Sequence, residues 1–385
     1  MTTYLDHAAT TPLRPEAAEA MAPFLSGRFG NASGSHAVAR AARAAVEEAR
    51  ETMAAALGAR PGEVVFTGSG TEADNLAVLG TVAAARGGWG GGGPGRPAVC
   101  TAVEHEAVLA SVTVVGGTVV AVGADGVVDL DDLEAALGPD VVVVSVMLAN
   151  NEVGVVQPFE AVVEVVRRGA PGALLHTDAV QAFPWLDVAD LAAGADMVAV
   201  SAHKFGGPQG VGALVVRGER APAPVIHGGG QERGLRSGTH NVAGIVGMAA
   251  AAEATVRQRQ FTVARVGALR DRLADGLLRA VPGAVETGGR ERKVAGSCHL
   301  RIPGVESEAL LFLLDESGLC ASAGSACASG ALEPSHVLMA MGLPEDEALS
   351  ALRLSLGWCS TDADVDTALA VIPAAVARLR STIPA

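Results

Sequence analysis

Short apolar runs alternate with segments of helical spacing through the first part of the chain. Each run is four to eight residues long, as expected for strands buried in a sheet. Strands that alternate with helices predict an α/β fold, in which helices flank a mostly parallel sheet. The predicted strands are Glu63–Thr67, Pro97–Val103, Val119–Gly123, Val141–Leu148, Ala173–His176, Met197–Val200 and Val211–Val216, and the predicted helices between them are Glu72–Ala85, Leu130–Leu137 and Phe159–Arg168.

The pattern differs at both ends of the chain. The first 14 residues look extended, and helical spacing follows over Pro15–Leu25 and His36–Leu57. From about Gln258 a long amphipathic pattern leads into shorter mixed elements. These are the predicted helices Phe261–Val281, Ser307–Glu316, Glu333–Met341 and Asp362–Leu379, and the strands Ser297–Ile302 and Leu352–Leu356. We therefore expect a large domain over residues 15–257, and a smaller α+β domain formed by residues 1–14 and 258–385.

Polar residues follow directly after several of the predicted strands. They are Thr71, His105, Asn151, Asp178 and Lys204. In a mostly parallel sheet, ligands bind outside the carboxyl ends of the strands. We therefore expect these residues to meet in one cleft, although they span much of the sequence.

Lys204 is the centre of this predicted cleft. The apolar run Met197–Val200 delivers it through Ser201 and His203 to a turn rich in glycine. A partly desolvated lysine has a depressed pKa and becomes a nucleophile that can form a Schiff base. The alternative is a surface lysine in a turn, but matching chemistry at the other strand ends favours the functional interpretation.

Two further motifs suggest what the cleft holds. Gly68, Ser69, Gly70 and Thr71 precede a helix, where N–H groups and the helix dipole favour an anion. The alternative is a simply capped helix, with Thr71 as the N-cap and Asp74 completing a partial capping box. Asp178 could hold a protonated ring nitrogen by charge pairing, or it could be another helix cap.

His105 and Arg353 add two functions to this set. His105 could stack on a planar ring and move protons, although a lone histidine is often structural. Arg353 projects from its strand opposite three leucines and could bind a carboxylate with two hydrogen bonds, or form a surface salt bridge. A lysine, an anion cradle, an acid and a histidine are together the set that pyridoxal 5′-phosphate (PLP) requires.

Composition excludes several other classes of function. The net charge of −14 disfavours binding to nucleic acid or to anionic membranes, and only 3% of residues are aromatic. The apolar stretches are too short to span a bilayer, and the N-terminus lacks the features of a signal peptide. An odd number of cysteines, five, with no C-x-x-C pair, favours a reducing cytoplasm and gives no sign of a metal site.

The chain resembles the cysteine desulfurases of the class V aminotransferase group, which are fold type I PLP enzymes. The resemblance covers nearly the whole chain, and its motifs occur in the family's order. The motifs are YLDHAATTP (Tyr4–Pro12), GNASGSH (Gly30–His36), FTGSGTEADN (Phe66–Asn75), EHEAV (Glu104–Val108), NNEVGVVQP (Asn150–Pro158), HTDAVQ (His176–Gln181), SAHKFGGPQGVGAL (Ser201–Leu214), GGGQERGLRSGTHN (Gly228–Asn241), AGSACASGALEPSHVL (Ala323–Leu338) and LRLSLG (Leu352–Gly357). His7 stands where the family usually has Asn or Tyr.

The resemblance implies a role for each residue of the predicted cleft. Lys204 forms the Schiff base with the cofactor, and His105 stacks on its ring. Asp178 pairs with the ring nitrogen, and Gln181 pairs with the ring oxygen. The phosphate is held by Gly70, Thr71, Ser201 and His203, and by Thr239 of the neighbouring subunit, which implies a homodimer. The substrate carboxylate is held by Asn151, which also lies at the cofactor, and by Arg353.

By the same resemblance, Cys327 is the nucleophile that accepts sulfur. It lies in a run of small residues, Ala323–Gly330, that cannot pack tightly, which suits a thiol that must meet a substrate and then an acceptor. The stretch that follows resembles the longer-loop group of desulfurases that feed iron–sulfur scaffolds. The other four cysteines, Cys100, Cys298, Cys320 and Cys359, sit in or beside apolar strands and are expected in the core.

The function predicted from these observations is conversion of L-cysteine to L-alanine, with sulfur left as a persulfide on Cys327. The sulfur would pass to an acceptor protein that serves iron–sulfur clusters, other sulfur-containing cofactors or tRNA. A selenocysteine lyase would use the same residues, whereas an aminotransferase would not need the cysteine loop. A PLP-binding protein without turnover is a further alternative.

Overall fold

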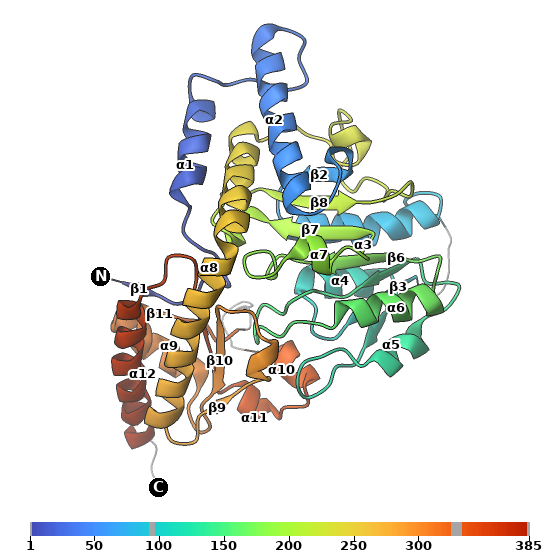
Figure 1. Cartoon of the computed structure of the whole chain (residues 1–385). Helices are drawn as coiled ribbons and strands as arrows, with labels where there is room; N and C mark the ends of the chain where they lie inside the picture. Colours follow the sequence, from blue (N-terminus) through green and yellow to red (C-terminus); the bar gives the residue numbers. More distant parts are fainter. Residues whose placement is uncertain (1, 92–96, 325–332, 383–385) are drawn as a thin grey trace.

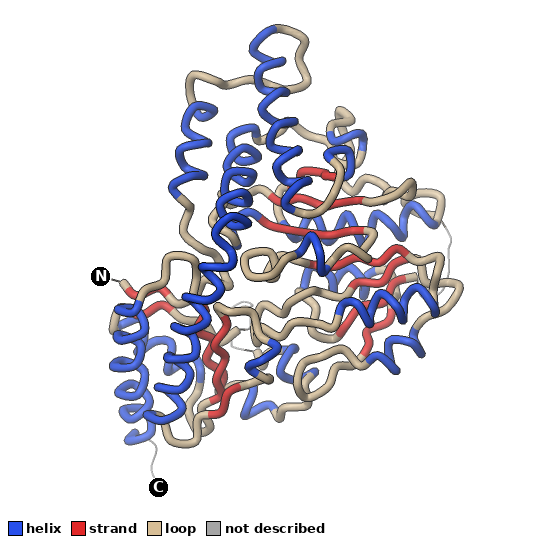
Figure 2. Tube along the Cα trace, in the orientation of Figure 1, coloured by secondary structure: helices blue, strands red, loops and turns tan. Residues whose placement is uncertain are grey.

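The computed structural model describes residues 2–91, 97–324 and 333–382. These residues form two regions: the larger one contains one β-sheet, and the smaller one contains two (Figure 1). Figure 2 shows the strands as two separate groups, with the long helix α8 running past both. Among the described residues, no helix combines the length and the apolar character needed to cross a membrane.

The larger region is built on a seven-stranded sheet with the strand order β2-β8-β7-β6-β5-β3-β4. β8 runs antiparallel to both of its neighbours, and the remaining pairs are parallel. The strands are β2 (Val64–Thr67), β3 (Ala98–Thr101), β4 (Thr118–Val120), β5 (Val143–Ser145), β6 (Leu174–Asp178), β7 (Met197–Ser201) and β8 (Gly212–Val216). The predicted mostly parallel sheet is confirmed.

Both faces of this sheet are buried, which explains the continuous apolar runs in the sequence. Along β7, Met197 and Ala199 face one core cluster, whereas Val198 and Val200 face the other. The first face is covered by α3 (Gly70–Ala85) and α4 (Glu106–Val114). The second is covered by α1 (Pro15–Met21), α2 (Ala37–Ala56), α5 (Leu130–Ala136), α6 (Phe159–Gly169), α7 (Val188–Leu191) and the first part of α8 (Val242–Ala280).

α2 illustrates how the sequence forms these helices. His36 caps its N-terminus, because Nδ1 accepts a hydrogen bond from the Ala39 N–H at 3.2 Å. Alanines give the helix high propensity, and its buried face recurs every three or four residues. The helix ends just before Gly58, whose φ of +60° suits glycine.

The smaller region contains a three-stranded antiparallel sheet in the order β12-β10-β9, and a parallel pair of β1 with β11. Leu273, Leu300, Leu314, Leu354 and Ile372 belong to its separate hydrophobic core. The strands are β1 (Thr3–Tyr4), β9 (Val285–Glu286), β10 (Ser297–Arg301), β11 (Leu319–Cys320) and β12 (Ala351–Ser355), and the helices are α9 (Ser307–Glu316), α10 (His336–Ala340), α11 (Glu345–Ala348) and α12 (Asp362–Thr382). Short 3₁₀ helices span Ala22–Leu25, Pro61–Glu63, Ala202–Lys204, Glu232–Gly234 and Arg290–Arg292.

α8 is much longer than the sequence analysis predicted. The expected start was Phe261, but the helix begins at Val242, where the Asn241 side chain accepts a hydrogen bond from the Gly244 N–H. Its first part is buried against α1 and α2 and is apolar nearly all round, so it lacks the one-sided pattern that marks a surface helix. The predicted domain boundary at residues 257/258 falls inside this continuous helix, and the division into domains stays a prediction.

Candidate functional site

A cavity of about 410 Å³ lies at the carboxyl ends of β6 and β7, beside the N-terminus of α3. It is within the size range of small-molecule sites. Nine of the predicted residues line it: Gly70, Thr71, His105, Asn151, Asp178, Gln181, Ser201, His203 and Lys204, and Arg353 reaches it from β12 as a tenth. The expectation that strand ends meet in one cleft is therefore confirmed as a matter of geometry.

Lys204 is the last residue of the 3₁₀ helix that follows β7. Its Nζ donates to the Ala8 carbonyl oxygen at 2.5 Å and to the Ala9 carbonyl oxygen at 2.9 Å. The pKa of Lys204 is lowered to about 8, chiefly by burial and also by the Arg353 charge, against which the Asp178 and Asp6 charges act. A neutral amine is therefore accessible near physiological pH, as a nucleophilic or basic lysine requires.

The carboxylate at the floor of the cavity is Asp178, the last residue of β6. It is 5% exposed, and its Oδ1 accepts a hydrogen bond from the Val180 N–H at 2.8 Å. Burial raises the pKa of Asp178, whereas the charges of His105 and Lys204 lower it. A cationic group bound in the cavity would compensate the buried carboxylate.

His105 and Gln181 line the same cavity as Asp178. His105 caps α4, because its Nδ1 accepts a hydrogen bond from the Ala107 N–H at 3.1 Å. In the neutral imidazole the proton is therefore on Nε2. Gln181 donates from Nε2 to the Ala8 carbonyl oxygen at 2.6 Å, the same oxygen that Lys204 contacts.

The N-terminus of α3 forms the side of the cavity that suits an anion. Gly70 and Thr71 are its first residues, whose N–H groups have no carbonyl one turn earlier in the helix. Gly70 lies so close to the sheet that an added Cβ would come within 2.9 Å of Val180 and 3.2 Å of Ser201. His203 lies nearby with its Nδ1 3.2 Å from the Thr10 hydroxyl, and burial lowers the pKa of His203 to about 4.

The prediction that Thr71 caps this helix is wrong. The N-cap is Ser69, whose hydroxyl accepts a hydrogen bond from the Glu72 N–H at 3.1 Å. Glu72 in turn accepts from the Gly68 N–H at 2.8 Å. Ser69 takes the cap because it is the last residue with extended backbone, and Thr71 is left free to face the cavity.

Arg353 reaches the cavity from the smaller region. Its guanidinium pairs with the Asp6 carboxylate at 2.8 Å and donates to the Asn151 carbonyl oxygen at 3.1 Å. The side chain is buried rather than exposed, so the alternative of a surface salt bridge is wrong. Its Nε is buried and has no hydrogen-bond partner among the described residues.

The structure also adds residues that the sequence analysis missed. Asp6, Ala8 and Ala9 line the cavity from the N-terminal segment, and Asp74 lines it from α3. Asp74 lies about one helical turn after Gly70, so helical spacing could have identified it. Ser322 and Gly324 complete the lining on the side of the smaller region.

Two predicted residues are not placed in the cavity. Thr239 is exposed and does not line the cavity of its own chain, which leaves its predicted role at a neighbouring subunit untested. Cys327 lies outside the described residues. Of the four cysteines expected in the core, Cys100 and Cys298 are buried, but Cys320 is partly exposed and Cys359 is exposed. Cys359 follows its strand into a surface turn, where the apolar pattern no longer applies.

Comparisons with known proteins agree with this geometry. The family model of class-V aminotransferases matches residues 3–368. The chain belongs to the class-V aminotransferase family. An IscS-like cysteine desulfurase of Mycobacterium tuberculosis is 48% identical, over 98% of this chain and 97% of that protein. A cysteine desulfurase of Gluconacetobacter diazotrophicus is 42% identical, over 99% of this chain and 95% of that protein.

A solved structure of a NifS-like protein has the same fold. It superimposes with a TM-score of 0.89 at 36% sequence identity, and the match covers 98% of this chain and 100% of that chain. Class-V aminotransferases and cysteine desulfurases use PLP as their cofactor. The donor set of the cavity fits that group: a lysine with a lowered pKa, a buried carboxylate, and a helix N-terminus with hydroxyl and imidazole neighbours.

Proposed function

We infer that this chain is a PLP-dependent cysteine desulfurase, which converts L-cysteine to L-alanine and transfers the sulfur as a persulfide to Cys327. The observation that carries the inference is the convergence of Lys204, Asp178 and Arg353 in one cavity, in a chain 48% identical to a cysteine desulfurase over nearly its full length. Lys204 would hold the cofactor covalently, and Asp178 and Gln181 would contact its ring. Gly70, Thr71, Ser201 and His203 would hold its phosphate.

The substrate is bound by its carboxylate. Arg353 offers a guanidinium, and Asn151 lies beside it at the cavity wall. When bound, PLP supplies an electron sink for a carbanion at the substrate Cα. We assign proton removal from that carbon to the Nζ of Lys204. The alternative base, His105, already uses its Nδ1 lone pair to cap α4.

Sulfur transfer needs no external oxidant. The Cys327 thiolate attacks the substrate sulfur, so that a sulfur–sulfur bond forms and the bond from Cβ to sulfur breaks. The electrons of the broken bond remain on the carbon fragment, which takes up a proton and leaves as L-alanine. The products of one turnover are therefore alanine and a persulfide on Cys327, and a thiol reductant or acceptor protein then removes the sulfur.

Product analysis tests this function. The purified protein is given L-cysteine and dithiothreitol, and alanine and sulfide are expected in equal amounts. Pyruvate formation with transfer of the amino group would instead indicate an aminotransferase. Bound PLP without products would indicate a non-catalytic protein. Turnover of selenocysteine alone would indicate a selenocysteine lyase.

Mass spectrometry locates the sulfur. After brief exposure to L-cysteine, the peptide that contains Cys327 should gain one sulfur atom, and Cys327→Ser should retain PLP but release no sulfide. Cys359→Ser is the matched control, because that thiol is exposed but outside the cavity. Sulfur on Cys320 or Cys359, or a fully active Cys327→Ser, would contradict the assignment.

Assembly and cellular role extend the same proposal. We propose a homodimer in which Thr239 of each chain completes the phosphate site of the other, which its exposed position supports. Light scattering should then give twice the chain mass, and Thr239→Ala should weaken PLP retention. The four described cysteines are free thiols, which suits a reducing cytoplasm. We propose an acceptor protein of iron–sulfur cluster or other sulfur-cofactor assembly as the partner that takes the sulfur.

A further inference from the structure

The N-terminal segment Asp6–Thr11 joins the two regions of the molecule at the cavity. Its Ala8 N–H donates to the Ser355 hydroxyl at 2.8 Å, and Asp6 pairs with Arg353. At its other end, the Thr11 N–H donates to the His203 carbonyl oxygen at 3.1 Å. The segment is thus held by β12 on one side and by the 3₁₀ helix Ala202–Lys204 on the other.

The carbonyl groups of this segment form a receiving site for an amine. The Ala8 carbonyl oxygen accepts from Lys204 at 2.5 Å and from Gln181 at 2.6 Å, and the Ala9 carbonyl oxygen accepts from Lys204 at 2.9 Å. Hydrogen bonds from an ammonium to carbonyl oxygens favour its charged form, whereas burial disfavours it. The position of these two carbonyls therefore influences when Lys204 carries a proton.

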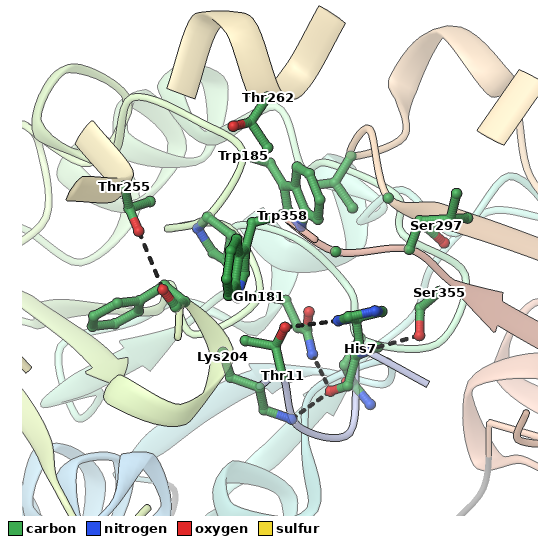
Figure 3. A pocket seen from close by; sticks show the side chains of 18 of the residues that line it. His7, Thr11, Gln181, Trp185, Lys204, Thr255, Thr262, Ser297, Ser355 and Trp358 are labelled. Carbon is green, nitrogen blue, oxygen red and sulfur yellow. Dashed lines mark hydrogen bonds between the residues drawn. The ribbon is translucent and has the colours of Figure 1, made fainter. Parts of the chain in front are cut away.

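The His7 side chain holds the segment in place through two contacts of its ring. It is 6% exposed, its Nδ1 lies 2.7 Å from the Thr11 hydroxyl, and its Nε2 lies 3.3 Å from the Ser360 hydroxyl. Figure 3 shows His7 and Thr11 joined in this way, with Lys204 and Gln181 close by. The ring lies against Gly357, where an added Cβ would come within 2.1 Å of Nδ1. The imidazole is therefore held on several sides.

We propose that His7 is a positioning residue that holds the Ala8 and Ala9 carbonyls as a receiving site for the Lys204 amine whenever that amine is not bound to the cofactor. This proposal rests on the role given to Lys204 under the proposed function. The lysine must leave the cofactor when a substrate amine takes its place, and it must then be held close to the reacting carbon. The two carbonyls hold it there without adding a further charged group.

The test measures the protonation of Lys204 through its reaction with PLP. Full-length protein freed of cofactor is mixed with PLP over a range of pH values, and the adduct is trapped with borohydride and mapped by mass spectrometry. Only the neutral amine reacts, so the rate reports the fraction of neutral Lys204. The charged groups that act on this lysine are Arg353, Asp178 and Asp6, and none of them is changed in the variants.

His7→Ala should lower the pH midpoint of this reaction by about one unit, because the carbonyls that favour the ammonium are no longer fixed. His7→Asn should restore the wild-type midpoint, since its side chain places a polar atom where Nδ1 contacts Thr11. Thr11→Val removes the same contact from the other side and should repeat the shift. Thr262→Val is the matched control. Thr262 is a buried threonine of α8, and it lines the smaller cavity next to the main one (Figure 3).

The outcomes separate this proposal from the proposed function. If no adduct forms on Lys204 of the wild type, the proposed function fails. If the adduct forms but His7→Ala and Thr11→Val keep the wild-type midpoint, only the positioning role of His7 is overturned. An equal shift in Thr262→Val would also overturn it. Should His7→Ala fail to fold, Thr11→Val decides alone.

Discussion

The two sides of the cavity are built differently. The side on the large sheet consists of Asp178, the last residue of β6, and Lys204, which follows β7. The pairing of these two parallel strands fixes the spacing of the two residues. The opposite side consists of the Ala8 and Ala9 carbonyls and of Arg353, which are held by contacts between residues far apart in the chain. The first side supplies the groups for cofactor chemistry, and the second positions the lysine and the substrate carboxylate.

This difference also appears in how each side stabilises charge. Asp6 on the second side is paired with Arg353. Beside the large sheet and outside the cavity lining, Glu104 follows β3 and is fully buried. It accepts hydrogen bonds from the Thr101 hydroxyl and the Met147 N–H, and no cation contacts its carboxyl group among the described residues. Substitutions on the sheet side should therefore affect cofactor binding and pH dependence, whereas those on the other side should affect substrate binding.

The largest expected effect is on the sheet side, at Lys204. Lys204→Ala should abolish the borohydride-trapped adduct and lower turnover by at least about 10²–10⁴-fold. The measurement is clear because the chain contains only two lysines. The other, Lys293, is buried and paired with Glu286 at 3.0 Å, so Lys293→Arg is the control. An adduct on Lys293 would refute the assignment.

On the opposite side, Arg353→Lys should raise KM for L-cysteine and leave PLP content unchanged. A lysine cannot reproduce two parallel hydrogen bonds to a carboxylate. The loss of one such charge-assisted contact is about 1.5–3 kcal/mol, or roughly a ten- to hundredfold higher KM. Arg272→Lys, on the exposed face of α8, is the control. Loss of PLP with an unchanged KM would assign Arg353 to the cofactor instead.

The buried carboxyl group of Glu104 predicts a pH dependence of stability. Burial raises the pKa of Glu104 to about 8, above its unfolded value of about 4.3. The stability this group contributes is thus complete below about pH 4 and is lost as the pH rises toward 8, by up to about 1.4 kcal/mol per pH unit. Glu104→Gln cannot ionise, so its melting temperature should fall less between pH 5 and 8. If the melting temperatures of the wild type and of Glu104→Gln fell by the same amount between pH 5 and 8, Glu104 would not carry a buried proton.

The smallest effect should separate the two candidates for the cap of α3. Ser69→Ala should lower the free energy of unfolding by about 1 kcal/mol, because it removes the acceptor for the Glu72 N–H. Thr71→Val should leave stability unchanged and should weaken only PLP retention. Urea unfolding of both variants measures the difference, and a larger loss for Thr71→Val would restore the cap to Thr71.

The sequence by itself determined the large sheet and the side of the site that follows its strands. Apolar runs with helices between them define parallel strands, and parallel strands bring their carboxyl ends to one edge. Asp178, Ser201 and Lys204 could therefore be placed together from local patterns alone. The chemistry of a lysine with an acid and an anion cradle then indicated PLP.

Only the tertiary structure decided the opposite side of the site. The Ala8 and Ala9 carbonyls have no sequence signature, because every residue carries a carbonyl and only packing selects which one accepts. The Asp6–Arg353 pair joins positions 347 residues apart, which no local pattern can reveal. The first part of α8 could not be predicted from the sequence for a related reason. Burial on nearly every side removes the periodic contrast between apolar and polar faces from which a helix is predicted.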